Sequence, residues 1–253
     1  MRGYWFMLEV CVDSVEGARI AASAGAQRIE LSERLEVGGI TPSQSLIRDA
    51  IDLQESLRAD LQITNSQSRP MKTVALIRCR PGDFYFGDVE LQHMHDEAQA
   101  AIDLGCTGIA VGASVQGNGL NWDFLESIAH RFPKVERVIH RVFDLVPNPM
   151  LAIPRLLDLG YCRILSSGGA ERAEDSTEQL RAWQEAFGEK MEILPAGGIS
   201  RLNATEILNR TGCRQLHGSF RGTSLDSQQS RLPAPDEIRA VRLLLDQWLA
   251  SHR

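Results

Sequence analysis

One local pattern recurs along this sequence: an amphipathic helical stretch, then a glycine, then a short run rich in β-branched and other apolar residues. The glycines are Gly25, Gly105, Gly160 and Gly212, and the apolar runs follow within about three residues of each. A glycine just past a helix end adopts the left-handed conformation that closes the last turn. A short apolar run after it is typical of a parallel strand that is covered on both faces. The pattern therefore predicts alternating strands and helices.

Filling the gaps between these four repeats predicts eight strands and eight helices. Strands are expected near 7–12, 27–31, 72–78, 107–111, 136–142, 162–166, 191–195 and 213–217. Helices are expected near 14–24, 43–58, 88–104, 122–131, 149–159, 174–187, 203–210 and 235–250. Eight βα units in 253 residues predict an α/β protein with the (β/α)8 TIM-barrel fold, as a single domain over 1–253. An open doubly wound sheet is the alternative, but it usually has five or six strands.

Composition excludes several classes of protein. A formal net charge of -6 argues against a general nucleic-acid binder, which needs a basic face for phosphates. No apolar run is long enough to cross a bilayer, and Glu9 interrupts the N-terminal apolar stretch too early for a signal peptide. The five cysteines include no close C-x-x-C pair, so a disulfide framework or zinc ribbon is not expected. We therefore expect a cytoplasmic protein without nucleic-acid or membrane partners.

Polar side chains occur on faces of the predicted strands that should point into the barrel. Side chains alternate along a strand, so Glu9 shares a face with Cys11, and Arg28 shares a face with Glu30. Buried carboxylates need partners, and Arg78 and neighbouring Arg80 of the third strand are expected to supply them.

We consider the inward polar residues together as a candidate catalytic or ligand-binding cluster. The cluster comprises Glu9, Glu30, Arg78, His140, Asp144 and His217. It is predicted to lie at the C-terminal strand ends, where barrel enzymes carry their active sites. A structural ion network that fills the barrel is the alternative interpretation.

Small residues follow the last three predicted strands. The loops contain Ser167, Gly168 and Gly169, then Gly197 and Gly198, then Ser219. Loops of this kind can bind a phosphate or another anion through their backbone N–H groups. These six residues form a candidate anion site, and tight turns are the alternative. The polar stretch 58–70 is expected to be a surface loop, and 221–235 a mobile flap on the functional face.

The cysteines differ in what their positions predict. Cys106, Cys162 and Cys213 each follow a helix-ending glycine and are expected to be small core residues at the opposite end of the barrel. Cys79 is expected to face the helices. Cys11 alone lies on an inward face near charged side chains, which makes it the candidate metal ligand.

Several strings of this sequence resemble the CutC copper homeostasis family. They include Leu8-Glu9-Val10-Cys11, Arg28-Ile29-Glu30-Leu31, Ile77-Arg78-Cys79-Arg80-Pro81-Gly82-Asp83-Phe84, His140-Arg141-Val142-Phe143-Asp144 and Arg163-Ile164-Leu165-Ser166-Ser167-Gly168. The resemblance extends in order to about His217. It implies a cytosolic TIM barrel that forms a homodimer or a higher homo-oligomer, with a role in copper homeostasis and copper(I) as the ion bound.

This chain departs from the family pattern in the second strand. Ser32 stands where the family commonly has a cysteine, so the thiol that would pair with Cys11 is missing. On the assumption that Cys11 and position 32 lie at one level of the barrel, a cysteine at position 32 is expected to strengthen copper(I) binding. The alternative function is an enzyme acting on a small anionic or phosphorylated metabolite. In that interpretation Arg78 and the late glycine loops hold the anion, and Glu9, Glu30, His140 or His217 transfers protons.

Overall fold

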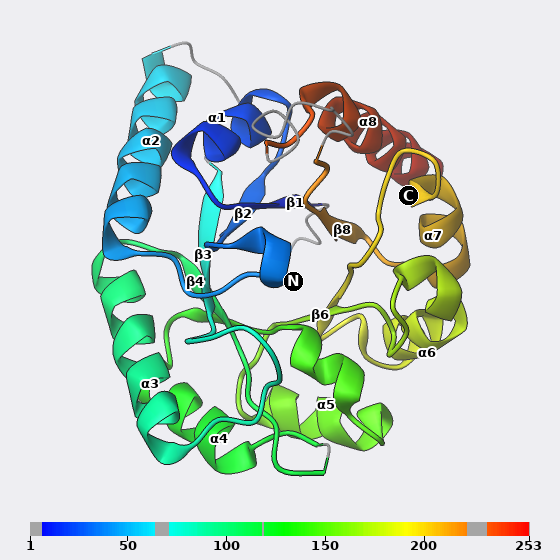
Figure 1. Ribbon diagram of the computed structural model, residues 1–253. Coiled ribbons are helices and arrows are strands. Elements are labelled where there is room, and N and C mark those ends of the chain that lie inside the picture. Colours follow the sequence, from blue (N-terminus) through cyan, green and yellow to red (C-terminus); the bar gives the residue numbers. More distant parts are fainter. Residues whose placement is uncertain (1–6, 64–70, 118, 222–231, 253) are drawn as a thin grey trace.

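The computed structural model, which describes residues 7–63, 71–117, 119–221 and 232–252, has eight parallel strands surrounded by helices (Figure 1). The strands are β1 (Met7–Val12), β2 (Arg28–Leu31), β3 (Lys72–Ile77), β4 (Gly108–Val111), β5 (Glu136–Ile139), β6 (Arg163–Ser166), β7 (Glu192–Pro195) and β8 (Gln215–Gly218). Their order in the sheet is β7-β6-β5-β4-β3-β2-β1-β8. The predicted (β/α)8 barrel is confirmed, and each strand begins within about two residues of its expected position.

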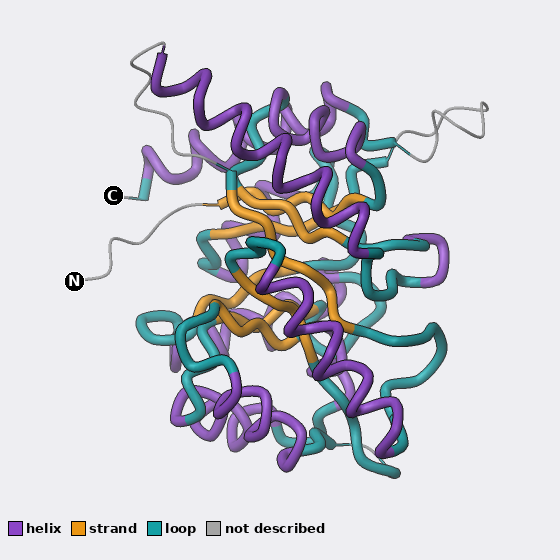
Figure 2. The backbone as a smooth tube through the Cα atoms, turned by 90° about the vertical axis from the view of Figure 1, so that its left-hand side faces the viewer, coloured by secondary structure: helices purple, strands orange, loops and turns teal. Residues whose placement is uncertain are grey.

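Helices follow the strands in the order that the sequence predicts, and they form the outer layer around the sheet (Figure 2). The α-helices are α1 (Val15–Ser23), α2 (Gln44–Ile63), α3 (Asp88–Asp103), α4 (Trp122–Arg131), α5 (Pro149–Asp158), α6 (Thr177–Phe187), α7 (Ala204–Thr211) and α8 (Pro235–Ser251). Three short 3-10 helices lie in the loops after strands: η1 (Leu35–Val37), η2 (Arg141–Leu145) and η3 (Ala173–Ser176). The four recurring glycines all have positive φ angles, as the repeated pattern requires.

Strand alternation divides the core into two parts. Val10, Leu31 and Ile77 are fully buried in the large apolar cluster between the strands and the helices. A second, smaller cluster is made by the other face of the strands and fills the barrel interior, with Val74, Leu76, Ala110, Val138, Leu165, Leu194 and Ala196. Glu9 and Glu30 alternate with Val10 and Leu31 and so point inward, as predicted.

The barrel has one seam. Within the part of the chain that the structure describes, no strand ladder joins β7 to β8, although both pair with their other neighbours. Glu192 and Ala196 donate their N–H groups to β6, so the alternate residues of β7 face β8. One of these is Pro195, which has no N–H to donate. The sequence of β7 therefore weakens the pairing that would close the ring.

Two elements end at different residues from those that the sequence predicts. The fifth strand stops at Ile139 rather than continuing to 142, because His140 accepts a hydrogen bond from the Val142 N–H and turns the chain into η2. Helix α2 continues to Ile63, so residues 58–63 are helical and not loop. That segment contains strong helix formers and no glycine or proline.

The remaining loop predictions fall largely outside the described residues, namely 64–70 and most of the flap predicted at 221–235. Among the helices that the structure describes, none is both long enough and apolar enough to cross a bilayer.

Candidate functional site

A pocket opens at the C-terminal ends of the strands, with a cavity volume of about 320 Å³. Its lining combines acidic, basic, thiol and apolar side chains with two glycine-containing loops. The lining residues are Cys11, Glu30, Leu35, Gly38, Leu76, Arg78, Phe84, His140, Arg141, Leu165, Gly197, Gly198, Ile199, His217, Gly218, Ser219 and Arg221. Four of the six cluster residues predicted from the sequence line it: Glu30, Arg78, His140 and His217.

Glu9 lies beneath the pocket in a fully buried ion pair. Its carboxylate accepts a hydrogen bond from Arg28 Nε, and its other oxygen lies 2.7 Å from His217 Nδ1. Burial alone would raise the pKa of Glu9, but Arg28 and His217 outweigh it and hold that pKa far below its ordinary value. Glu9 is therefore ionised and can only accept hydrogen bonds, so His217 must donate from Nδ1.

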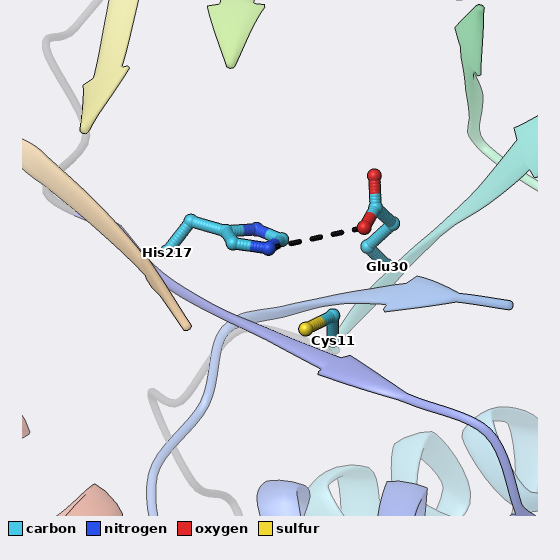
Figure 3. A group of neighbouring side chains, drawn as sticks. All are labelled: Cys11, Glu30 and His217. Atoms are coloured by element: carbon cyan, nitrogen blue, oxygen red, sulfur yellow. Dashed lines mark ion pairs between the residues drawn. The ribbon is translucent and has the colours of Figure 1, made fainter. Parts of the chain in front are cut away.

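The hydrogen bond to Glu9 fixes the orientation of the His217 ring, and the other ring nitrogen faces the pocket. Nε2 lies 3.8 Å from a carboxylate oxygen of Glu30, which projects from β2 (Figure 3). Cys11 on β1 completes the group, and one ligand atom from each residue lies within 4.8 Å of the others. The register explains this meeting, because Cys11 is paired with Glu30 and Glu9 with His217.

His217 is held in its protonated form in this arrangement. Burial would lower the pKa of its imidazole, but Cys11, Glu9 and Glu30 together raise it well above 6.5. The pocket floor thus contains an imidazolium group between two carboxyl groups and a thiol.

Glu30 differs from Glu9 in lacking hydrogen bonds. It is only 6% exposed, yet no described residue donates a hydrogen bond to its carboxylate. Burial is the largest influence and raises the pKa of Glu30 from 4.5 to about 7. A buried carboxyl group without donors lies ready to bind a cation or to exchange a proton near neutral pH.

This raised pKa predicts an effect of pH on stability. Between pH 4.5 and about 7 the folded protein holds a proton on Glu30 that the unfolded chain releases, so stability must fall as pH rises through that window. We expect the wild type to lose about 1–3 kcal/mol relative to Glu30→Gln between pH 5 and pH 7.5. Urea denaturation of both proteins measures this difference, with Glu16→Gln on the exposed face of α1 as control. Parallel pH profiles for the wild type and Glu30→Gln would contradict the assignment.

His140 and Arg78 form a second polar part of the pocket. His140 accepts a hydrogen bond at Nδ1, so its remaining proton is on Nε2, and that buried atom has no partner among the described residues. Burial, reinforced by the charge of Arg78, lowers the pKa of His140 to about 3 and keeps the ring neutral. Arg78 lies over Phe84, whose ring centroid is 4.8 Å from the guanidinium carbon and 5.0 Å from the His140 ring centroid.

Arg78 and Arg80, which follow β3, do not pair with the buried glutamates, contrary to the sequence prediction. Arg78 donates to the backbone carbonyls of Gly39 and Gly82, at 3.0 and 2.6 Å, and Arg80 pairs with Glu90 near the surface. The partner of Glu9 is Arg28, on the adjacent strand at the level of Glu9. Side-chain alternation along β2 already predicts that Arg28 faces inward. The register that places Arg28 beside Glu9 could not be read from the sequence.

The predicted structural network also exists, lower in the barrel. Arg163 is 2% exposed and pairs with Glu192 at 2.7 Å and with Glu136 at 3.3 Å. The structural ion network and the ligand-binding cluster, which were alternatives in the sequence analysis, therefore occupy different levels of the barrel. The lower charges pair with one another, whereas Glu30 and His217 face the pocket.

The predicted anion loops separate into two groups. Asp144 lies outside the pocket and accepts hydrogen bonds from the N–H groups of Ser167 and Gly169, at 3.0 and 3.3 Å. The loop after β6 is thus bound by a carboxylate of the protein itself. Gly197, Gly198 and Ser219, in contrast, line the pocket.

The other sequence expectations concern Ser32 and the remaining cysteines. The register pairs Cys11 with Glu30, so Ser32 lies two residues further along the chain, just past the end of β2, and the assumption that it shares the level of Cys11 is wrong. Cys106 and Cys213 are buried as expected, whereas Cys162 is only partly buried. Two lining arginines, Arg141 and Arg221, were not among the predicted site residues. Arg141 was visible in the His140-Arg141 motif, but nothing in the sequence showed its direction.

Comparison with known proteins identifies the family of this chain. The sequence profile of the CutC family matches residues 6–222. The chain belongs to the CutC family. A CutC family protein of Caulobacter vibrioides is 33% identical over 88% of this chain and 84% of the relative. The human copper homeostasis protein cutC homolog is also 33% identical, over 86% of this chain and 74% of its own length.

A solved CutC structure has the same fold. The putative copper homeostasis protein CutC from Streptococcus agalactiae matches with a TM-score of 0.73 and 26% identity, over 85% of this chain and 99% of that one. The matched residues 6–222 include Cys11, Glu30 and His217, so the pocket floor lies within the part of the chain that matches the family.

Proposed function

We propose that this CutC protein acts in copper homeostasis by binding one copper(I) ion at Cys11, Glu30 and His217. The observation that supports this most directly is the convergence of a thiol, an imidazole and a carboxyl group at the pocket floor. Thiolate and imidazole are ligands that suit copper, and the carboxylate of Glu30 adds a negative charge. The relatives named for copper homeostasis support the same assignment.

The surroundings of His217 fit a metal ligand. The ring donates from Nδ1 to the carboxylate of Glu9, which leaves Nε2 as the atom available to an ion. Carboxylate–histidine pairs of this kind orient the ring and raise its basicity at metal sites. Arg28 in turn holds Glu9. The chain thus supplies three ligands and a support for the histidine.

A competition titration tests this proposal. Under reducing conditions, a chromophoric copper(I) chelator should lose one ion per chain to the wild-type protein. We expect Cys11→Ser to weaken copper(I) binding by about 100-fold or more, because a neutral hydroxyl is a poor ligand for a soft ion. Cys79→Ser is the matched control, since Cys79 is a half-buried cysteine outside the pocket. Tight binding that survives Cys11→Ser would refute the proposed site.

The cytoplasmic location, expected from composition and from the family resemblance, and the homo-oligomer, expected from the resemblance, stay predictions.

A further inference from the structure

The rim of the pocket has a different character from its floor. Three guanidinium groups line the pocket, from Arg78, Arg141 and Arg221, together with the glycine loop after β7 and Ser219 after β8. The site proposed for copper accounts for none of these groups. They carry positive charge, which suits an anionic ligand, although Arg221 is already paired with Asp13 at 2.6 Å.

The loops after β7 and β8 contain backbone donors that the protein does not use. Within the described ranges, no acceptor binds the N–H groups of Gly197, Gly198 or Ser219. This differs from the loop after β6, whose N–H groups already donate to Asp144.

Arg141 brings a positive charge to the same place. Its Nε donates to Asp144 at 2.8 Å and its Nη2 to Ser167 Oγ at 2.7 Å, which fixes the guanidinium plane. Its Nη1 has no acceptor among the described residues and lies 3.5 Å from the position that a Cβ atom on Gly197 would occupy. The side chain is 40% exposed, so the Nη1 donor of this paired arginine is available to a ligand in the pocket.

Glycine is required at this rim for two reasons. Gly197 and Gly198 have φ angles of 92° and 72°, which L side chains rarely adopt. A Cβ atom at Gly197 would also lie 2.9 Å from the Glu171 carbonyl oxygen. Without side chains, the backbone of this loop can approach a ligand closely.

We infer that Gly197, Gly198, Ser219 and Arg141 bind the phosphate group of a small phosphorylated ligand. Several N–H donors and a guanidinium match the oxygens of a phosphate, and the loops after strands seven and eight are a frequent phosphate site in barrels. The rest of the ligand then extends toward Glu30 and His217. This inference does not depend on copper, and it gives the pocket a second ligand of a different chemical class.

Thermal unfolding with three-carbon probes tests the inference. A ligand that binds only the folded state raises the melting temperature, so glycerol 3-phosphate should raise it in a concentration-dependent way. Glycerol at the same concentrations is the uncharged comparison, and glycerate replaces the phosphate with a carboxylate. Stabilisation by glycerate equal to that by glycerol 3-phosphate would overturn the assignment of a phosphate.

Two variants locate the site. Ser219→Asp places a negative charge at the rim and should weaken glycerol 3-phosphate binding by at least about 10-fold, and Arg141→Gln should do the same. Arg181→Gln, which removes an exposed arginine on α6 outside the pocket, should leave binding unchanged. Because Arg141 also holds Asp144, its variant could fail to fold, and Ser219→Asp then decides. Unchanged binding in folded Ser219→Asp would place the ligand elsewhere and overturn the inference. A copper(I) titration of the same variant tests the copper site independently.

Discussion

Replacing Arg28 with methionine is expected to destabilise the protein by about 3–5 kcal/mol, because the change leaves the buried carboxylate of Glu9 without its main counter-charge. Arg28 is fully buried, and it also donates to Gln215 Oε1 at 2.8 Å. Methionine has a similar length and fills most of the space but cannot donate a hydrogen bond. Urea denaturation measures the effect, provided that the slope of the transition stays unchanged.

Two further variants make this prediction specific to the ion pair. Arg19→Met removes an exposed arginine that pairs with Glu16 at 3.7 Å, and it should cost less than about 1 kcal/mol. The double variant Arg28→Met/Glu9→Gln should be more stable than Arg28→Met alone, since no unpaired charge remains. If Arg28→Met and Arg19→Met were equally stable, the buried pair would not support the site as described.

Acidification is expected to weaken copper(I) binding by about 1000-fold or more between pH 8 and pH 6, if the proposed site is correct. Metal ligands must be deprotonated to bind, so the ion competes with protons at the thiol, the imidazole and the carboxyl group. Without the ion, the pKa of His217 lies well above its ordinary value and that of Glu30 is raised to about 7, so both groups must release protons to the ion. The same chelator competition, repeated across this pH range, gives the slope.

Calorimetry in two buffers of different ionisation enthalpy counts the protons released. Two to three protons per copper ion are expected for the wild type, and Glu30→Gln should release fewer near neutral pH. Glu16→Gln should match the wild type, because Glu16 is exposed on α1. An affinity that is independent of pH would exclude His217 and Cys11 as ligands.

The fold was predictable from local signals because four of the βα units carry the same helix–glycine–strand pattern. Glycines with positive φ close the helices, and buried apolar runs follow them, so strand positions required no long-range information. Local signals failed where a side chain altered the backbone. His140 ends β5 early through its hydrogen bond to the Val142 N–H, and no periodicity reveals that contact.

The site was only partly predictable, because alternation gives the face of a residue but not its neighbour. The sequence placed Glu9, Glu30 and His217 inside the barrel, whereas their partners depend on the register between strands. The separation of Asp144 from the pocket depends on the loop after β6, whose N–H groups bind it. The direction of Arg141 likewise follows from contacts with residues about thirty positions away.

The seam between β7 and β8 has a consequence for how the barrel moves. A ring of strands that lacks one ladder is a split ring, and local opening costs least where the fewest backbone hydrogen bonds must break. Gly197 follows β7 and Ser219 follows β8, so the two loops lie on opposite sides of the seam, and His217 lies on β8 itself. A ligand that contacts both loops would hold β7 and β8 together. Binding would then make the whole barrel more rigid. Local opening between β7 and β8 would let the ligand enter and leave.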